Sequence, residues 1–134
     1  MAITTVTHIN LRGNARQALE FYRSVFGGEL TAFTHGDAGT PDVSPDQLTW
    51  GQVRSPEGFH IMAYDVPPAR TWNQGDNPFF VSVRGQDADE ISGYWKKLSE
   101  GSTVIVDLGP AGWSPLYGML TDPFGITWVL DIAV

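Results

Sequence analysis

Few residues of this chain have side chains that could do chemistry. Histidine occurs three times, at His8, His35 and His60, and cysteine does not occur. The lack of cysteine excludes disulfides, thiolate catalysis and thiolate metal sites. His8, His60 and Asp131 lie in segments with the alternating pattern of strands, so they could converge on one ligand if their strands line a common cleft. The spacing allows this convergence without requiring it.

Each of these residues also has a structural interpretation. His60 beside a turn and Asp131 near the chain end are more often solvated than functional, and we favour that interpretation. For His8, lining a cleft and making a structural hydrogen bond are equally good explanations. His35 lies in a segment rich in Gly, Asp, Pro and Ser, residues 35–45, which we expect to be a surface loop without a role in a site.

Aromatic residues are more numerous than titratable ones in the segments expected around a cleft. They are Trp50, Tyr64, Phe80, Trp113, Tyr117 and Trp128. Trp128 alternates with Thr127 and Val129 and is expected to pack on a helix, whereas Trp113, in a Gly-Trp-Ser-Pro loop, is expected at a cleft edge. Most aromatics of a small domain belong to its core, but an apolar pocket with a few polar groups is also what a small-molecule site needs.

The elements that would position these residues occur twice. Strands are expected at 3–11, 30–34, 48–53 and 59–66, and again at 79–83, 103–108, 118–120 and 126–132. After the first strand of each set, apolar residues recur at helical spacing, at 15–26 and at 87–98. Asn14 and Asp87 are suitable N-caps, the latter with Glu90 in a capping box. Residues 67–77 have the composition of a linker.

The closing hairpins give the clearest evidence of duplication. Ser55-Pro-Glu-Gly58 matches Asp122-Pro-Phe-Gly125, 67 positions later, and both glycines are expected to have positive φ. The front segments of the two sets match at an offset of 72 residues, which pairs His8 with Phe80. Arg12 and Arg84 then follow their strands in the same way, and this identical placement indicates a structural role for both. The chain therefore predicts an α+β fold, a single domain over 1–134 with two tandem βαβββ modules at about 1–66 and 78–134.

Composition limits the function classes. The net charge of -7 disfavours binding to nucleic acid, whose phosphates it would repel. No apolar run is long enough to span a bilayer and no secretion signal is evident, so we expect no membrane partner and a cytoplasmic location.

Two motifs resemble those of the vicinal oxygen chelate superfamily, the fold of glyoxalase I and the bleomycin-resistance proteins, and especially its PhnB-like branch. The residues 11–28 resemble the branch's opening strand and helix, and 117–125 resemble its closing turn. The resemblance implies two modules whose mixed sheets curl around a shared cleft, a small-molecule ligand, and a homodimer.

The resemblance also implies where a metal would bind. In metal-using members the ligands come from the first and last strands of each module, and the corresponding residues here are His8, Met62, Phe80 and Val129. One imidazole is too few donors for a hard divalent cation, so no metal or other cofactor is expected. We expect a small-molecule-binding protein; the alternative is an enzyme of the superfamily, a lyase, isomerase or dioxygenase-like protein, that uses His8. The expected ligand-binding residues are His8, Asn10, Trp50, Met62, Tyr64, Phe80, Trp113, Tyr117 and Val129.

Overall fold

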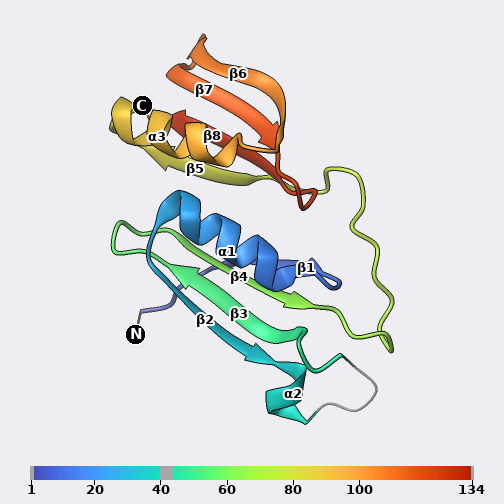
Figure 1. Cartoon of the computed structure of the whole chain (residues 1–134). Coiled ribbons are helices and arrows are strands. Elements are labelled where there is room, and N and C mark those ends of the chain that lie inside the picture. Colours follow the sequence, from blue (N-terminus) through green and yellow to red (C-terminus); the bar gives the residue numbers. More distant parts are fainter. Residues whose placement is uncertain (1, 40–43, 134) are drawn as a thin grey trace. The chain divides into compact units, whose positions relative to one another are not determined.

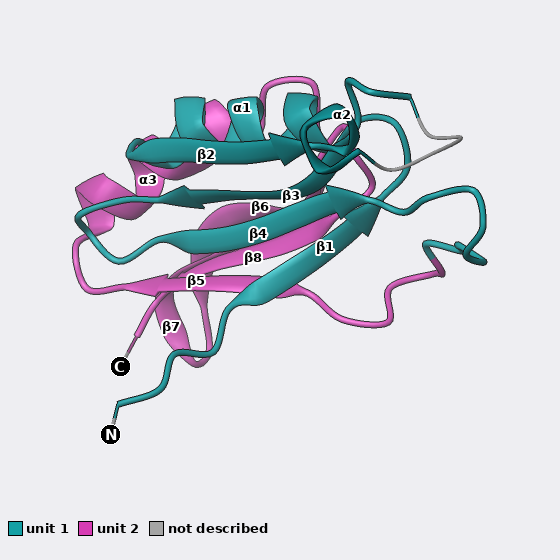
Figure 2. Cartoon of the chain, turned by 90° about the horizontal axis from the view of Figure 1, so that it is seen from below, with its two compact units in different colours: residues 1–74 teal, residues 75–134 magenta. Residues whose placement is uncertain are grey.

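The computed structural model describes residues 2–39 and 44–133 (Figure 1). The chain divides into two compact units, Met1–Gln74 and Gly75–Val134 (Figure 2), and each is described by itself below. The boundary between the units falls inside the segment 67–77, which the sequence indicates as a linker.

Within its described residues, unit 1 contains one four-stranded sheet and two helices. In chain order they are β1 Thr7–Leu11, α1 Ala15–Phe26, β2 Glu29–Thr34, α2 His35–Ala38, β3 Leu48–Arg54 and β4 His60–Asp65. The strand order is β1-β4-β3-β2, with β1 parallel to β4 and the other neighbours antiparallel. The predicted helix has the expected bounds, whereas the first strand begins four residues later than expected.

Unit 2 repeats this topology. Its elements are β5 Val81–Gly85, α3 Ala88–Leu98, β6 Thr103–Ala111, β7 Ser114–Thr121 and β8 Thr127–Ile132. The strand order is β5-β8-β7-β6, and again only the outer pair β5 and β8 is parallel. The predicted α+β fold with two βαβββ modules is therefore confirmed.

In each unit the long helix packs on one face of the sheet (Figure 1). Two glycines at equivalent positions in the hairpins allow close packing there. A Cβ atom on Gly51 would lie 2.6 Å from Leu19 Cδ1, and one on Gly118 would lie 2.8 Å from the Trp95 ring. A larger residue at either position would require the contacting helix side chain to shift. The other face of each sheet, which its helix does not cover, is called the open face.

The predicted hairpin turns are confirmed. Gly58 and Gly125 have φ of 108° and 86°, in the region that glycine enters without strain. The residue that opens each turn also accepts a bond with its side chain, because Ser55 Oγ accepts from the Phe59 amide and Asp122 Oδ1 accepts from the Ile126 amide. The offset of 67 residues therefore holds through both hairpins.

The N-cap predicted at Asp87 is confirmed, whereas the capping box predicted with Glu90 and the cap predicted at Asn14 are not formed in the described structure. Asp87 caps α3, accepting from the amides of Asp89 and Glu90, while the Glu90 carboxylate accepts from the Tyr94 hydroxyl. Asn14 occupies the N-cap position of α1, but its side chain makes no capping bond.

Asp65, at the end of β4, caps α1 in place of Asn14. Its Oδ1 accepts from the amides of Gly13 at 2.7 Å and Ala15 at 3.1 Å. The prediction that the Asn14 side chain caps α1 was wrong, because the side-chain bonds at the start of this helix come from a carboxylate of a distant strand.

The expected loop at 35–45 begins with the short helix α2. Thr34 and Asp37 form a capping box, in which each side chain accepts from the other residue's amide. These bonds lower the pKa of Asp37 below its ordinary 3.8. Residues 40–43 of this segment lie outside the described part of the chain.

The register of the parallel pairs corrects the alignment of the two front segments. His8 is opposite Met62 in unit 1, whereas Ser82 is opposite Val129 in unit 2. Since Met62 and Val129 are equivalent, the partner of His8 in the repeat is Ser82 and not Phe80. Phe80 lies just before β5 and is 45% exposed. A slip of two residues keeps every side chain on the same face, so apolar patterning alone does not detect it.

Candidate functional site

Five of the predicted ligand-binding residues lie on the open face of unit 1. Burial alternates along β1 and β4: Ile9, Leu11, Ile61 and Ala63 are buried, and the residues between them are exposed or half-buried. The side chains of this open face that enter the argument are His8, Asn10, Thr31, Phe33, Trp50, Gln52, Arg54, His60, Met62 and Tyr64.

Strand register arranges these side chains in three rows across the sheet. The middle row runs Thr31, Gln52, Met62 and His8, each opposite the next. Neighbours on one face of a sheet are within contact range of each other. This row combines one apolar side chain with three polar ones.

The flanking rows differ strongly in character. On one side Phe33 is opposite Trp50, and Tyr64 is opposite Asn10, which makes this row aromatic. On the other side Arg54 is opposite both Glu29 and His60, which makes that row charged. The open face of unit 1 therefore changes from aromatic to charged over the width of three rows.

Two histidine–amide pairs lie on this face. His8 Nδ1 is 3.1 Å from Asn10 Oδ1, and the His8 ring meets the Tyr64 ring edge-on at 5.4 Å. His60 Nε2 is 2.7 Å from Gln52 Oε1. Burial, and then the positive charge of Arg54, lower the pKa of His60 below its ordinary 6.5, so that its imidazole is neutral at pH 7.

The open face of unit 2 carries Tyr117 and Val129 of the predicted set. Asp131, on the same face, is buried and forms an ion pair with Arg84, whose Nε lies 3.0 Å from Asp131 Oδ1. The interpretation that Asp131 frays with the chain end is therefore wrong. Asp131 is also opposite Tyr117 in the register of β7 and β8. His8 and His60 share a face of unit 1, while Asp131 belongs to unit 2 and has its own partner.

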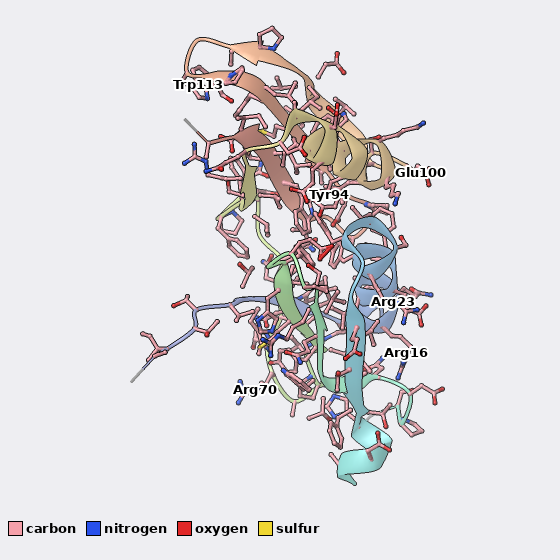
Figure 3. The ribbon with its side chains drawn as sticks, turned by 90° about the vertical axis from the view of Figure 1, so that its left-hand side faces the viewer. Arg16, Arg23, Arg70, Tyr94, Glu100 and Trp113 are labelled. Carbon is pink, nitrogen blue, oxygen red and sulfur yellow. The ribbon has the colours of Figure 1, made fainter. Side chains whose placement is uncertain are left out.

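Of the three tryptophans of unit 2, Trp113 and Trp128 enter the sequence predictions, and the structure confirms the placement of Trp128. Trp113 lies at the turn between β6 and β7 (Figure 3). It is 65% exposed, and its ring meets the Tyr117 ring edge-on at 5.2 Å. Trp128 is fully buried on the helix-covered face, and its Nε1–H donates to Asp122 Oδ2 at 2.9 Å. Trp128 is thus a core residue, and Trp113 stays a candidate for ligand contact.

Arg12 and Arg84 do not have the same role. Arg12 follows β1 and donates to the carbonyl oxygens of Val66, Pro67 and Arg70. Its guanidinium also lies 5.7 Å from the centre of the Trp72 ring. Arg12 thereby fixes the beginning of the linker on unit 1, whereas Arg84 lies within β5 and pairs with a carboxylate.

Three residues near this site were missed by the sequence analysis. Gln52 and Arg54 alternate with Trp50 along β3, and that alternation was an available signal for placing them on the same face. His35, expected in a loop without a role, is buried: its Nε2 lies 3.3 Å from the Asp65 carbonyl and its Nδ1 lies 3.1 Å from Thr49 Oγ1. Its contacts are structural.

The residues at the superfamily's ligand positions do not fit a hard divalent cation. With the corrected register they are His8 and Met62 in unit 1 and Ser82 and Val129 in unit 2. They supply one imidazole, one thioether, one hydroxyl and one side chain without a donor. Within residues 2–39 and 44–133 no group of three or more His, Asp or Glu side chains is arranged to hold a metal ion.

No helix in the described part of the chain combines the length and apolar character needed to cross a bilayer.

Comparison with known proteins places this fold in a family. The family model for the Glyoxalase/Bleomycin resistance protein/Dioxygenase superfamily matches residues 5–130. No curated protein matches the chain.

Several solved structures are similar to the chain. Protein PA1353 from Pseudomonas aeruginosa is 28% identical, with a TM-score of 0.85 and 98% of each chain covered. A PhnB protein from Bacillus cereus, described as a putative 3-demethylubiquinone-9 3-methyltransferase, is 20% identical with a TM-score of 0.75, covering 98% of this chain and 100% of the other. A superfamily domain from Frankia sp. EAN1pec, 9% identical with a TM-score of 0.68, covers 100% and 99%. On the family match and this shared fold, the chain belongs to the Glyoxalase/Bleomycin resistance protein/Dioxygenase superfamily.

Proposed function

We propose that this chain is a small-molecule-binding protein of the superfamily that works without a divalent metal. The observation that carries the proposal is the open face of unit 1. There, aromatic side chains and oriented polar groups lie in adjacent rows, the mixture that small-molecule sites use.

The donor set supports a role without a metal. A divalent cation would have to draw most of its shell from water, because His8 is the only strong nitrogen or oxygen donor at the four ligand positions. Met62 would also make that water shell costly, since apolar surface disfavours ions and their hydration. The same side chain suits contact with an apolar part of a ligand.

Ligand mapping by NMR tests the proposal. The protein, labelled with ¹⁵N, is titrated with a panel of small aromatic and aliphatic compounds that includes neutral, acidic and basic members. We expect hits to shift the amides of β1, β3 and β4 and to bind at least about tenfold more weakly to Trp50→Ala, since truncating a well-packed aromatic contact costs on the order of 1.4 kcal/mol or more. A panel without hits, or hits that shift only residues away from the open faces, would contradict the proposal.

A second candidate is an enzyme in which a histidine of this face moves a proton. The pair of His60 and Gln52 favours it, because a neutral imidazole held by a partner at 2.7 Å has the arrangement of a general base. Each hit of the panel is incubated with the protein in D₂O and followed by NMR. Deuterium incorporation at carbon, lost in His60→Gln, would support the enzyme over the binding protein.

A further inference from the structure

Trp113 and Tyr117 form a corner of two aromatic rings on unit 2. Trp113 is 65% exposed, and its ring meets the Tyr117 ring edge-on at 5.2 Å, with an angle of 77° between the two planes. One small group placed in this corner lies against a face of each ring. The faces of aromatic rings carry partial negative charge and therefore attract cations.

The corner is open, and the backbone that carries it is fixed. Gly109 is opposite Tyr117 in the register of β6 and β7, and a Cβ atom at Gly109 would meet nothing within 4 Å. The space on that side of the tyrosine is therefore free. The buried Ser114 hydroxyl, next to Trp113 in the chain, lies 3.0 Å from the carbonyl oxygen of Ile132 and ties the turn to β8. A site on such a backbone needs little ordering when a ligand binds.

The charge of unit 2 favours a cation over an anion. Residues 75–134 contain eight Asp and Glu but only three Lys and Arg, so this unit has a formal charge of -5. Two of its carboxylates lie on strands beside the corner. Asp131 is opposite Tyr117, and Asp107 is exposed on β6, close to Gly109 in the chain. A net negative charge of this size attracts cations to the unit.

The three basic residues of unit 2 do not oppose a cation in the corner. Lys96 and Lys97 belong to α3, which packs on the other face of the sheet. Arg84 lies on β5, with β8 between it and Tyr117, and its Nε is 3.0 Å from Asp131 Oδ1. Its positive charge is thus offset by the carboxylate that separates it from the tyrosine.

We propose that Trp113 and Tyr117 bind the quaternary ammonium group of a small organic cation. Ring faces replace the hydrogen bonds of water poorly, so a nitrogen covered by methyl groups, which makes none, loses less on binding than a primary ammonium. This site belongs to unit 2 and does not depend on the open face of unit 1. It is therefore a second site, beyond the proposed function, and it requires no metal and no chemical step.

A cation and its uncharged isostere test the site. Choline and 3,3-dimethylbutan-1-ol, in which carbon replaces the charged nitrogen, are each titrated into the ¹⁵N-labelled full chain. We expect choline to shift the indole N–H signal of Trp113 and the amide of Tyr117. We also expect it to bind at least about fivefold more tightly than the alcohol, since each ring face adds a cation–π contribution.

Matched variants separate cation–π contact from apolar contact. Trp113→Leu should remove the preference for choline, and Trp113→Phe should keep part of it, because phenyl attracts cations less strongly than indole. Phe79→Leu, which replaces another exposed aromatic residue of unit 2, is the control and should keep the full preference.

Several outcomes would overturn this proposal. They are the absence of any shift with choline, equal affinity for choline and the alcohol, and a preference for choline that survives Trp113→Leu. Loss of choline binding as the chain concentration rises would show that a second copy covers Trp113, and it would overturn the proposal as well. None of these results affects the proposed function, which is measured on the amides of β1, β3 and β4 in unit 1.

Discussion

At the scale of single residues, the Asp65 carboxylate connects three parts of unit 1. Oδ1 accepts from the amides of Gly13 and Ala15, just before and at the start of α1, and Oδ2 accepts from the Leu48 amide at 2.8 Å. The backbone carbonyl of Asp65 lies next to His35 of α2. The side chain is buried, so water is a poor substitute for these bonds. An unsatisfied buried donor costs about 1–3 kcal/mol.

Asp65→Ala should therefore lower the free energy of unfolding by about 3 kcal/mol or more, because it leaves the amides of Gly13, Ala15 and Leu48 without the carboxylate. Asn14→Ala is the matched control and should change that free energy by less than about 0.5 kcal/mol, since the Asn14 side chain makes no capping bond. Urea unfolding measures both. A larger loss of stability in Asn14→Ala than in Asp65→Ala would show that Asn14 caps α1, as the sequence predicts.

The lowered pKa of His60 predicts a particular pH dependence. The unfolded chain binds the proton more tightly than the folded one, so the contribution of His60 to stability is complete above pH 6.5 and is lost as the pH falls through the folded pKa. An NMR titration of the imidazole should give a midpoint below 6.5. Arg54→Gln should raise this midpoint while leaving it below 6.5, because burial is the larger cause of the shift.

Arg23→Gln serves as the control for this titration, because it removes an exposed positive charge from α1 instead of β3. It should leave the His60 midpoint unchanged. An equal rise in both variants would show that Arg54 acts through net charge and not through its place beside His60.

At the scale of elements, the hairpin glycines set the distance between helix and sheet. In unit 2, Gly118→Ala should destabilise the fold by about 1–3 kcal/mol, since the added Cβ would meet the Trp95 ring at 2.8 Å. Gly93→Ala, within α3 and with nothing within 4 Å of the added atom, should stabilise the fold by about 0.5–1 kcal/mol. Thermal unfolding of the two variants should therefore shift in opposite directions, and a neutral Gly118→Ala would mean that Trp95 moves aside without cost.

The elements that the sequence predicts well are those with local causes. The helix 15–26 follows from its apolar spacing, and the hairpins follow from turns in which glycine takes positive φ. The prediction of the α1 cap was wrong because the carboxylate that binds the Ala15 amide belongs to Asp65, which lies 50 residues away in the chain and outside any local pattern. Helix α2 had a local signal that was not used, the spacing of Thr34 and Asp37 in a capping box.

The candidate site shows the same division between local and distant causes. Alternation was enough to place five of the predicted residues on one face of unit 1. Neither the His60–Gln52 pair nor the three rows could be obtained that way, because both depend on the register between strands. The same limit explains the error at Phe80, since a slip of two residues leaves the pattern of faces unchanged.

At the scale of the whole molecule, we expect a homodimer with a two-fold, isologous interface, as closed dimers of identical chains have. Exposed apolar side chains, among them Ile105, provide surface for such an interface. Light scattering at micromolar concentrations should give twice the chain mass of 14.7 kDa. A monomer mass over that range would contradict the prediction.

The last prediction concerns the metal content of the purified protein. The purified protein should hold no stoichiometric divalent metal, since His8, Met62, Ser82 and Val129 together supply one strong donor. Elemental analysis near one metal per chain, lost in His8→Ala, would overturn this.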